Sequence, residues 1–276
     1  VHFKDTVWYD KGFDFYIGGG MFFAGKYNAN YYNGRADNEC NLNYVFKNRY
    51  WRQDILEEVV NNYSYISSSD SIYYREQDLP KQMNYKIKTS IALGMRYKIS
   101  DGWAISLTYN FARLVASDQY LLSYHSVSGN QYDQPVMILY GKEDRSLFDL
   151  AGSYVTHFNR IVRPFFELGA QFNYTEAKTF YTQLQKGSQQ YTLLDPYGGE
   201  SYVPGAQMTT YNVHYGGPGF GFSAAAGVKF VFNKTVSIDP TFYFTASKLG
   251  LKGYKDFSFS YAAMIRVVMT DFFFSR

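Results

Sequence analysis

The chain has 276 residues, which is enough for one large domain or two small ones. Its formal net charge is only +3, with acids and bases spread along the chain, so the basic stripe of a nucleic-acid-binding protein is excluded. It contains 29 Tyr and 24 Phe, yet its mean hydropathy is −0.33, a combination unusual for a soluble domain. No run of about 18 apolar residues occurs, which excludes a transmembrane helix.

A transmembrane β-barrel reconciles many aromatic residues with a low mean hydropathy. One face of each strand meets lipid, the other meets a polar lumen, and polar loops dilute the average. Such a strand needs about 9–11 residues with an apolar side chain at every second position. Residues 85–99 follow this rule best, because Ile91 and Leu93 belong to an apolar series that alternates with Lys88 and Arg96.

The same alternation predicts eight strands along the chain. The first three are expected at residues 13–23, 85–99 and 103–114. The remaining five are expected at residues 146–158, 163–175, 219–232, 236–246 and 257–272. The sequence therefore predicts an all-β fold, a single antiparallel up-and-down barrel that takes up residues 1–276.

The links between these strands alternate in length. Long links are expected at residues 24–84, 115–145 and 176–218, whereas the second and third, fourth and fifth, and sixth and seventh strands are joined by short turns. Outer-membrane barrels show this alternation, with short turns in the periplasm and long loops outside. We therefore expect a bacterial outer-membrane protein with both termini in the periplasm. A soluble β-sandwich would give no reason for the link lengths to alternate.

The strand count, the loop asymmetry and the aromatic last strand resemble the small outer-membrane barrels of the OmpA/OmpX type. The Tyr-rich loops and the overall size resemble the PorT-like barrels of Bacteroidota. The resemblance covers nearly the whole chain, but it concerns architecture and includes no catalytic signature. The PorT-like resemblance implies a role in the type 9 secretion and gliding apparatus as one option.

Charged residues occupy inward positions at similar heights near the periplasmic end of the expected barrel. Eight strands enclose a space that side chains just fill, so opposite charges there should pair. The predicted lumen charge network consists of Asp14, Arg96, Glu167, Lys229, Asp239 and Arg266, with Asp149 higher on the same inner face. We interpret this network as a plug of salt bridges; the alternative is a proton or ion path along the same groups.

Two long links carry candidate partner surfaces. Residues 51–62 have helical spacing, with Trp51, Ile55 and Val59 on an apolar stripe that packs within the loop or meets a partner. The third long link is rich in tyrosine, a residue that gives a large contact area with little loss of entropy. Its candidate contacts are Tyr181, Tyr191, Tyr197, Tyr202 and Tyr211.

Evidence for an enzyme is weak. His125 beside Ser126, His157 and His214 are the candidates for acid–base chemistry, but none has a spacing that defines an active site. We therefore expect no catalytic residues, no metal site and no cofactor, and we assign no role to Cys40.

The sequence thus predicts a non-enzymatic outer-membrane barrel with a plugged lumen. It would act as an anchor or accessory subunit through its loops, wall or periplasmic turns. The expected partners are outer-membrane lipid and lipopolysaccharide and other envelope proteins, but not nucleic acid. A narrow channel or ligand-uptake barrel gated by Tyr-rich loops is the first alternative, and a lipid-modifying barrel enzyme is the second.

Overall fold

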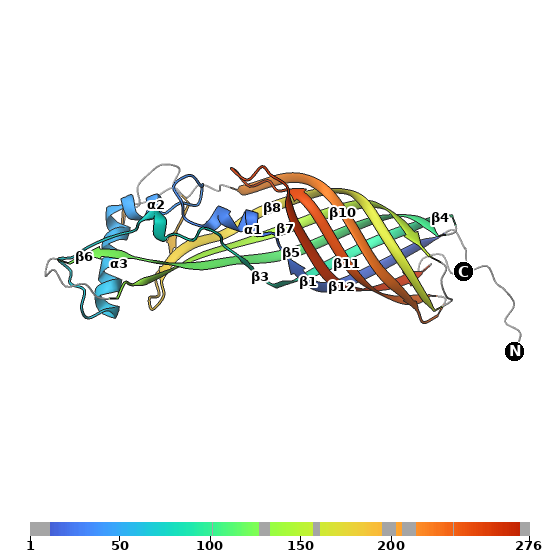
Figure 1. The fold of residues 1–276 in the computed structure, drawn as a ribbon, viewed down its shortest axis with the longest axis horizontal. Coiled ribbons are helices and arrows are strands. Elements are labelled where there is room, and N and C mark those ends of the chain that lie inside the picture. The colour runs from blue at the N-terminus through green and yellow to red at the C-terminus, as the bar shows by residue number, and fades with distance from the viewer. Residues whose placement is uncertain are drawn as a thin grey trace, which may run out of the picture.

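The structure is a computed structural model that describes residues 12–100, 102–126, 133–156, 161–194, 203–205, 214–233 and 235–270. Eight long strands form a closed ring in which each strand is antiparallel to both neighbours (Figure 1). In ring order these are β1 (Phe13–Phe23), β4 (Lys88–Ser100), β5 (Trp103–Leu121), β7 (Val136–Val155), β8 (Val162–Leu184), β10 (Tyr215–Val231), β11 (Val236–Lys248) and β12 (Ser258–Thr270). Because β12 pairs with β1, the ring is closed and the predicted eight-stranded antiparallel barrel is confirmed.

Shorter elements lie between these strands. The helices are α1 (Lys26–Ala29), η1 (Asn30–Tyr32), α2 (Asn43–Lys47), α3 (Arg49–Asn62) and η2 (Glu76–Asp78). The short strands are β2 (Ser71–Tyr73), β3 (Tyr85–Lys86), β6 (Ser123–His125) and β9 (Tyr191–Thr192). Among the described residues, no helix is long and apolar enough to cross a membrane.

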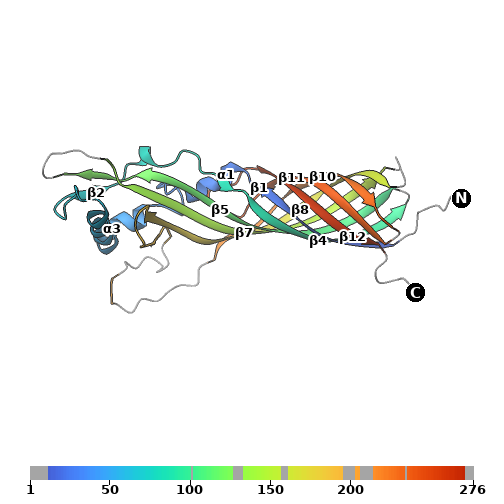
Figure 2. The same ribbon diagram turned by 90° about the horizontal axis from the view of Figure 1, so that it is seen from below.

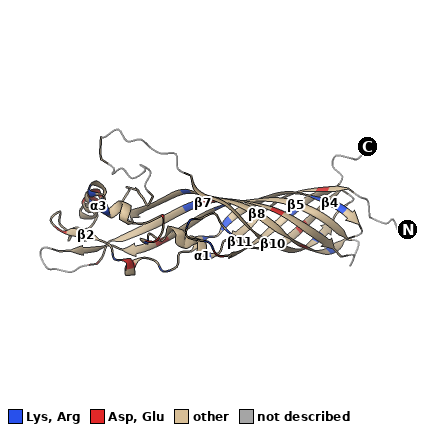
Figure 3. Cartoon of the chain, turned by 90° about the horizontal axis from the view of Figure 1, so that it is seen from above, with Lys and Arg blue, Asp and Glu red and all other residues tan. Residues whose placement is uncertain are grey.

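The outer wall of the barrel is apolar and exposed. Leu168 is 72% exposed, Phe222 61% and Leu150 58%, whereas the residues next to them in sequence point into the barrel. The charged positions of the barrel are scattered along its ribbon (Figure 3), and several of them, such as Arg96 and Glu167, are buried inside it. So large an apolar surface is stable only against lipid, and the wall therefore defines a transmembrane barrel.

Three strands continue far beyond the barrel. The strand expected at 103–114 extends to Leu121, the strand expected from 146 begins at Val136, and the strand expected to end at 175 extends to Leu184. Residues 115–121, 136–144 and 176–184 together form what we call the arm, which runs away from the barrel (Figure 2). Much of the sequence expected to form loops is thus strand. The expected strand ends at 158 and 272 lie outside the described residues.

The segment from Ala24 to Lys86 packs on one face of the arm and forms, with it, what we call the head. The shared core buries Leu42, Ile55 and Val59 from this segment against Met137 and Leu139 of the arm. Helix α3 begins at Arg49. The Asn48 side chain caps it by accepting hydrogen bonds from the backbone N–H groups of Tyr50 and Trp51. The head is therefore a folded unit with its own core above the barrel.

This packing predicts that an added methyl group at Gly141 opens the head. A Cβ atom at Gly141 would lie 2.2 Å from the Tyr32 ring, a clash that should cost about 1–3 kcal/mol. Cys40 lies in the same core, fully buried, and its burial raises the pKa of the thiol. We expect Gly141→Ala to speed maleimide labelling of Cys40 about tenfold, because the open state is more populated.

The matched control is Gly152→Ala on the barrel wall, where the nearest atom to an added Cβ is 4.0 Å away. Labelling at the wild-type rate in both variants would contradict this account of the head.

Candidate functional site

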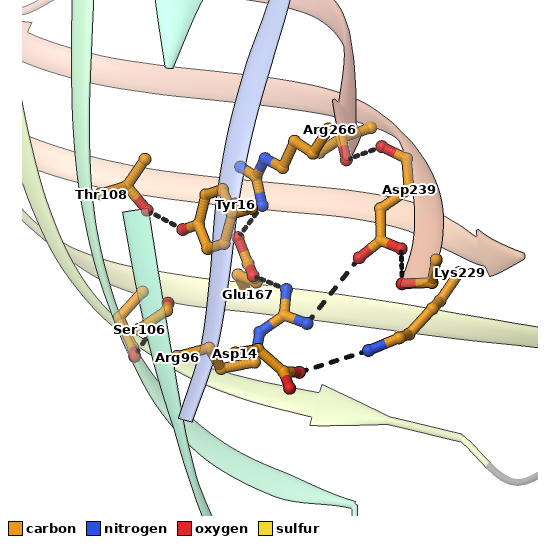
Figure 4. A network of polar contacts seen from close by, with 12 residues as sticks. Asp14, Tyr16, Arg96, Ser106, Thr108, Glu167, Lys229, Asp239 and Arg266 are labelled. Carbon is orange, nitrogen blue, oxygen red and sulfur yellow. Dashed lines mark hydrogen bonds and ion pairs between the residues drawn. The ribbon is translucent and has the colours of Figure 1, made fainter. Parts of the chain in front are cut away.

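The lower lumen is crossed by a carboxylate held between two arginines. Glu167 on β8 accepts from Arg96 Nη2 on β4 at 2.7 Å and from Arg266 Nη1 on β12 at 2.8 Å (Figure 4). All three side chains are nearly fully buried, because strand alternation directs them into a lumen too narrow for water-filled space. The contact joins three strands that are not neighbours in the ring.

Further ions extend this network toward the end of the barrel opposite the head. The Asp14 carboxylate on β1 lies 2.9 Å from Lys98 Nζ and 3.3 Å from Lys229 Nζ. Oδ2 of Asp239 lies 3.8 Å from Nη1 of Arg96. The structure thus brings together six of the seven residues named from the sequence. Lys98 was missed, although its inward position two residues after Arg96 is visible in the alternation.

A tyrosine closes the space above the two arginines. The ring of Tyr16 lies 5.1 Å from the guanidinium carbon of Arg266 and 5.8 Å from that of Arg96, and its hydroxyl contacts Thr108. Gly94 on the neighbouring strand makes room for it, since a Cβ there would lie 2.3 Å from the ring. Sequence alternation marks Tyr16 as inward but does not reveal this glycine–aromatic pairing.

Asp149 does not join the ion network. Its carboxylate accepts hydrogen bonds from Asn110 Nδ2 at 2.9 Å, Gln171 Nε2 at 3.0 Å and the Tyr243 hydroxyl at 3.0 Å. These neutral donors satisfy the buried carboxylate in place of a cation. This site is a separate hydrogen-bonded layer in the middle of the lumen.

A second ion pair, which the sequence analysis missed, closes the mouth below the head. Arg145 Nε lies 2.6 Å from Glu143, whose other oxygen accepts from the hydroxyls of Tyr32 at 2.8 Å and Tyr85 at 3.0 Å. Tyr32 comes from the first link, so this link itself seals the barrel. Its residues were assigned to an expected loop, and no strand periodicity could have placed them at the mouth.

An apolar layer lies between the mouth and the ion network. It includes Phe22, Leu114, Leu147 and Met264, all 4% exposed or less. Four successive layers thus fill the lumen: the ion network, the hydrogen-bonded layer around Asp149, the apolar layer and the ion pair at the mouth. Chemically, such an arrangement stabilises the fold.

The candidate partner surfaces are mostly buried. Ile55 and Val59 have no exposed surface and Tyr191 is 3% exposed, so these side chains form the head core and are not available to a partner. Trp51 packs against this core, and only Tyr181 of the described set lies on the outward face of the arm. Tyr197, Tyr202 and Tyr211 lie outside the described residues.

The candidate catalytic residues do not assemble. His125 lies in β6. Nδ1 of His214 lies 3.7 Å from Oε1 of Glu176, and about two thirds of the His214 side chain is exposed. His157 lies outside the described residues. Within the part of the chain that the structure describes, no group of three His, Cys, Asp or Glu residues is placed to hold a metal ion.

No protein-family model and no curated protein sequence matches the chain. Three solved structures that resemble it are small outer-membrane proteins. Neisserial surface protein A has a TM-score of 0.42 and 9% identity, covering 94% of this chain and 96% of its own. The outer membrane protein OprG from Pseudomonas aeruginosa has a TM-score of 0.41 and 11% identity, covering 96% of this chain and 99% of its own.

The third is Ail, the attachment invasion locus protein of Yersinia pestis, in complex with the heparin analogue sucrose octasulfate. It has a TM-score of 0.39 and 10% identity, covering 95% of this chain and 99% of its own. At these scores the likeness carries no argument about function. The closed ring and its apolar wall define the class directly: a transmembrane β-barrel of the outer-membrane type.

The ion network predicts a large effect of Glu167→Gln. The change leaves Arg96 and Arg266 buried without their carboxylate, which should lower the free energy of unfolding by about 3–5 kcal/mol. Urea unfolding of the barrel in lipid vesicles measures this free energy for the wild type and the variant.

The control is Glu176→Gln on the same strand, where the carboxylate pairs with Lys178 at the surface and the loss should be about 1 kcal/mol or less. Equal effects of the two variants would show that the buried network does not stabilise the barrel.

Proposed function

We propose that the protein is a closed, non-enzymatic outer-membrane barrel whose function is to anchor the head outside the cell. The filled lumen carries this proposal, because a barrel packed with side chains along its length is suited to holding a structure in place. The orientation follows from the general rule for such barrels, in which the long connections lie outside and the short turns face the periplasm. Both termini are then periplasmic.

The head supports a role in an assembly. It has a continuous core, so it presents a fixed surface at little entropic cost to a partner. Other envelope proteins are the partners we propose, reached through the head, the wall or the periplasmic turns. The PorT-like resemblance suggests the type 9 secretion and gliding apparatus as one such assembly.

Purification from native membranes in mild detergent, followed by mass spectrometry, tests the accessory role. We expect specific envelope proteins to remain bound at low detergent strength. A barrel that is isolated alone at every detergent strength contradicts the accessory role.

Conductance in a planar bilayer separates an anchor from a channel. Wild-type protein should show no steady single-channel openings, because buried side chains occupy the lumen among the described residues. The triple variant Arg96→Ala, Glu167→Ala, Arg266→Ala removes the buried bridge but leaves the apolar layer and the mouth in place, so it should stay closed. Arg113→Ala with Asp144→Ala, which removes an outward pair, should also stay closed. Steady openings of the wild type would favour the channel alternative instead.

A further inference from the structure

The outward face of the arm is a direct continuation of the lipid-facing wall. On β7, Leu150 and Phe148 point outward into the membrane, and the same alternation then carries Lys142, Tyr140 and Ile138 on the same side. The opposite face of the arm is buried against the head core. The outward face therefore stands directly above the lipid that surrounds the barrel.

A row of charged residues marks where the apolar wall ends. Arg113 on β5 forms two contacts with Asp144 on β7, at 2.7 and 2.9 Å, and Asp144 lies opposite Glu176 on β8. Charged side chains on the outward face are strongly disfavoured at the centre of a bilayer and tolerated at its surface. This row therefore lies at the level of the lipid headgroups.

A β-bulge places two lysines together just above this row. Lys142 lies opposite Thr179 while the next residue, Glu143, lies opposite Ala177, so Lys178 is the extra residue. A bulge redirects side chains, and that of Lys178 is 41% exposed. Lys178 pairs with Glu176 at 2.5 Å, and both lysines also interact electrostatically with the Asp144 carboxylate in the row below.

Neutral polar and aromatic side chains continue the face above the lysines. Tyr140 and Tyr181 stack across β7 and β8 with ring centroids 4.8 Å apart. Gln119 and Gln183 flank them on the neighbouring positions of β5 and β8, opposite Ile138. Tyrosine supplies a large, rigid contact area, and tyrosine hydroxyls and glutamine amides can both donate and accept hydrogen bonds, as the hydroxyl groups of a sugar require.

We propose that this face, which we call the headgroup face (Lys142, Lys178, Tyr140, Tyr181, Gln119 and Gln183), binds the phosphorylated sugar headgroup of an outer-leaflet glycolipid. The lysines contact phosphate at the membrane surface, and the tyrosines and glutamines contact the sugars that rise from it. The acyl chains of the same lipid lie against the wall below. The orientation with the head outside rests on the proposed function.

The test uses the full-length barrel in phosphatidylcholine nanodiscs that contain lipopolysaccharide as the probe, with native mass spectrometry to count bound molecules. Lys142→Glu with Lys178→Glu should weaken retention at least about tenfold, and Tyr181→Ser with Gln183→Ala should weaken it by a smaller factor. Lys47→Glu with Lys81→Glu makes the same charge change elsewhere on the exposed surface of the head and should have no effect.

Two comparisons make the result decisive. Dephosphorylated lipopolysaccharide should lose the dependence on the lysines, and phosphatidylglycerol should show no dependence on Tyr181. Slow maleimide labelling of Cys40, which is buried in the head core, verifies that each variant is folded. Equal retention by the headgroup-face and control variants overturns the proposal, as does retention of phosphatidylglycerol with the same dependence on Tyr181. The anchor role fails separately, through conductance of the wild type.

Discussion

The Glu167 carboxylate, held between Arg96 and Arg266, ties together β8, β4 and β12 across the inside of the barrel. In a buried environment each of these charges would cost several kcal/mol if left alone, so the three must remain together once the ring closes. Their contact fixes which side chains fill the lower lumen, and Tyr16 then packs over the two guanidinium groups. The proposal of a closed lumen rests on this arrangement.

The long strands pose a second physical problem, which the head solves. Where the three strands leave the ring, β7 stays paired on both sides, but β5 loses β4 and β8 loses β10. Unpaired strand edges of this kind invite aggregation. Strand β3 pairs with the edge of β5 and β9 pairs with the edge of β8, while the first link covers one face. The same link supplies Tyr32, which reaches Glu143 at the mouth. Covering the arm and sealing the barrel are thus two consequences of one packed segment.

Alternation of apolar residues predicted the barrel because lipid imposes a period of two on every membrane strand. The same phase assigned Asp14, Arg96, Glu167 and Asp239 to the lumen. It could not predict the arm, since residues such as Gln119 and Lys142 are polar on a face that meets neither the acyl chains of the membrane nor the core of the head. It left open whether Ile55 and Val59 pack within the loop or meet a partner, and packing in the head core resolves this in favour of burial. It could not predict that Tyr32 reaches the mouth, because that contact depends on long-range packing of the first link. The glycine–tyrosine pairings at Gly94 and Gly141 likewise become visible only once strand register is known.

Accessibility of the lumen to a small thiol reagent tests the central claim most directly. In a Cys40→Ser background, cysteines would be placed singly at the buried inward positions Ala92, Ala151 and Ala225, with the exposed position Ser188 as reference. Reagent applied from both sides of proteoliposomes should label the reference cysteine and leave the three lumen cysteines unmodified. Labelling of the lumen cysteines at the rate of the reference would show a water-filled passage and contradict the closed barrel.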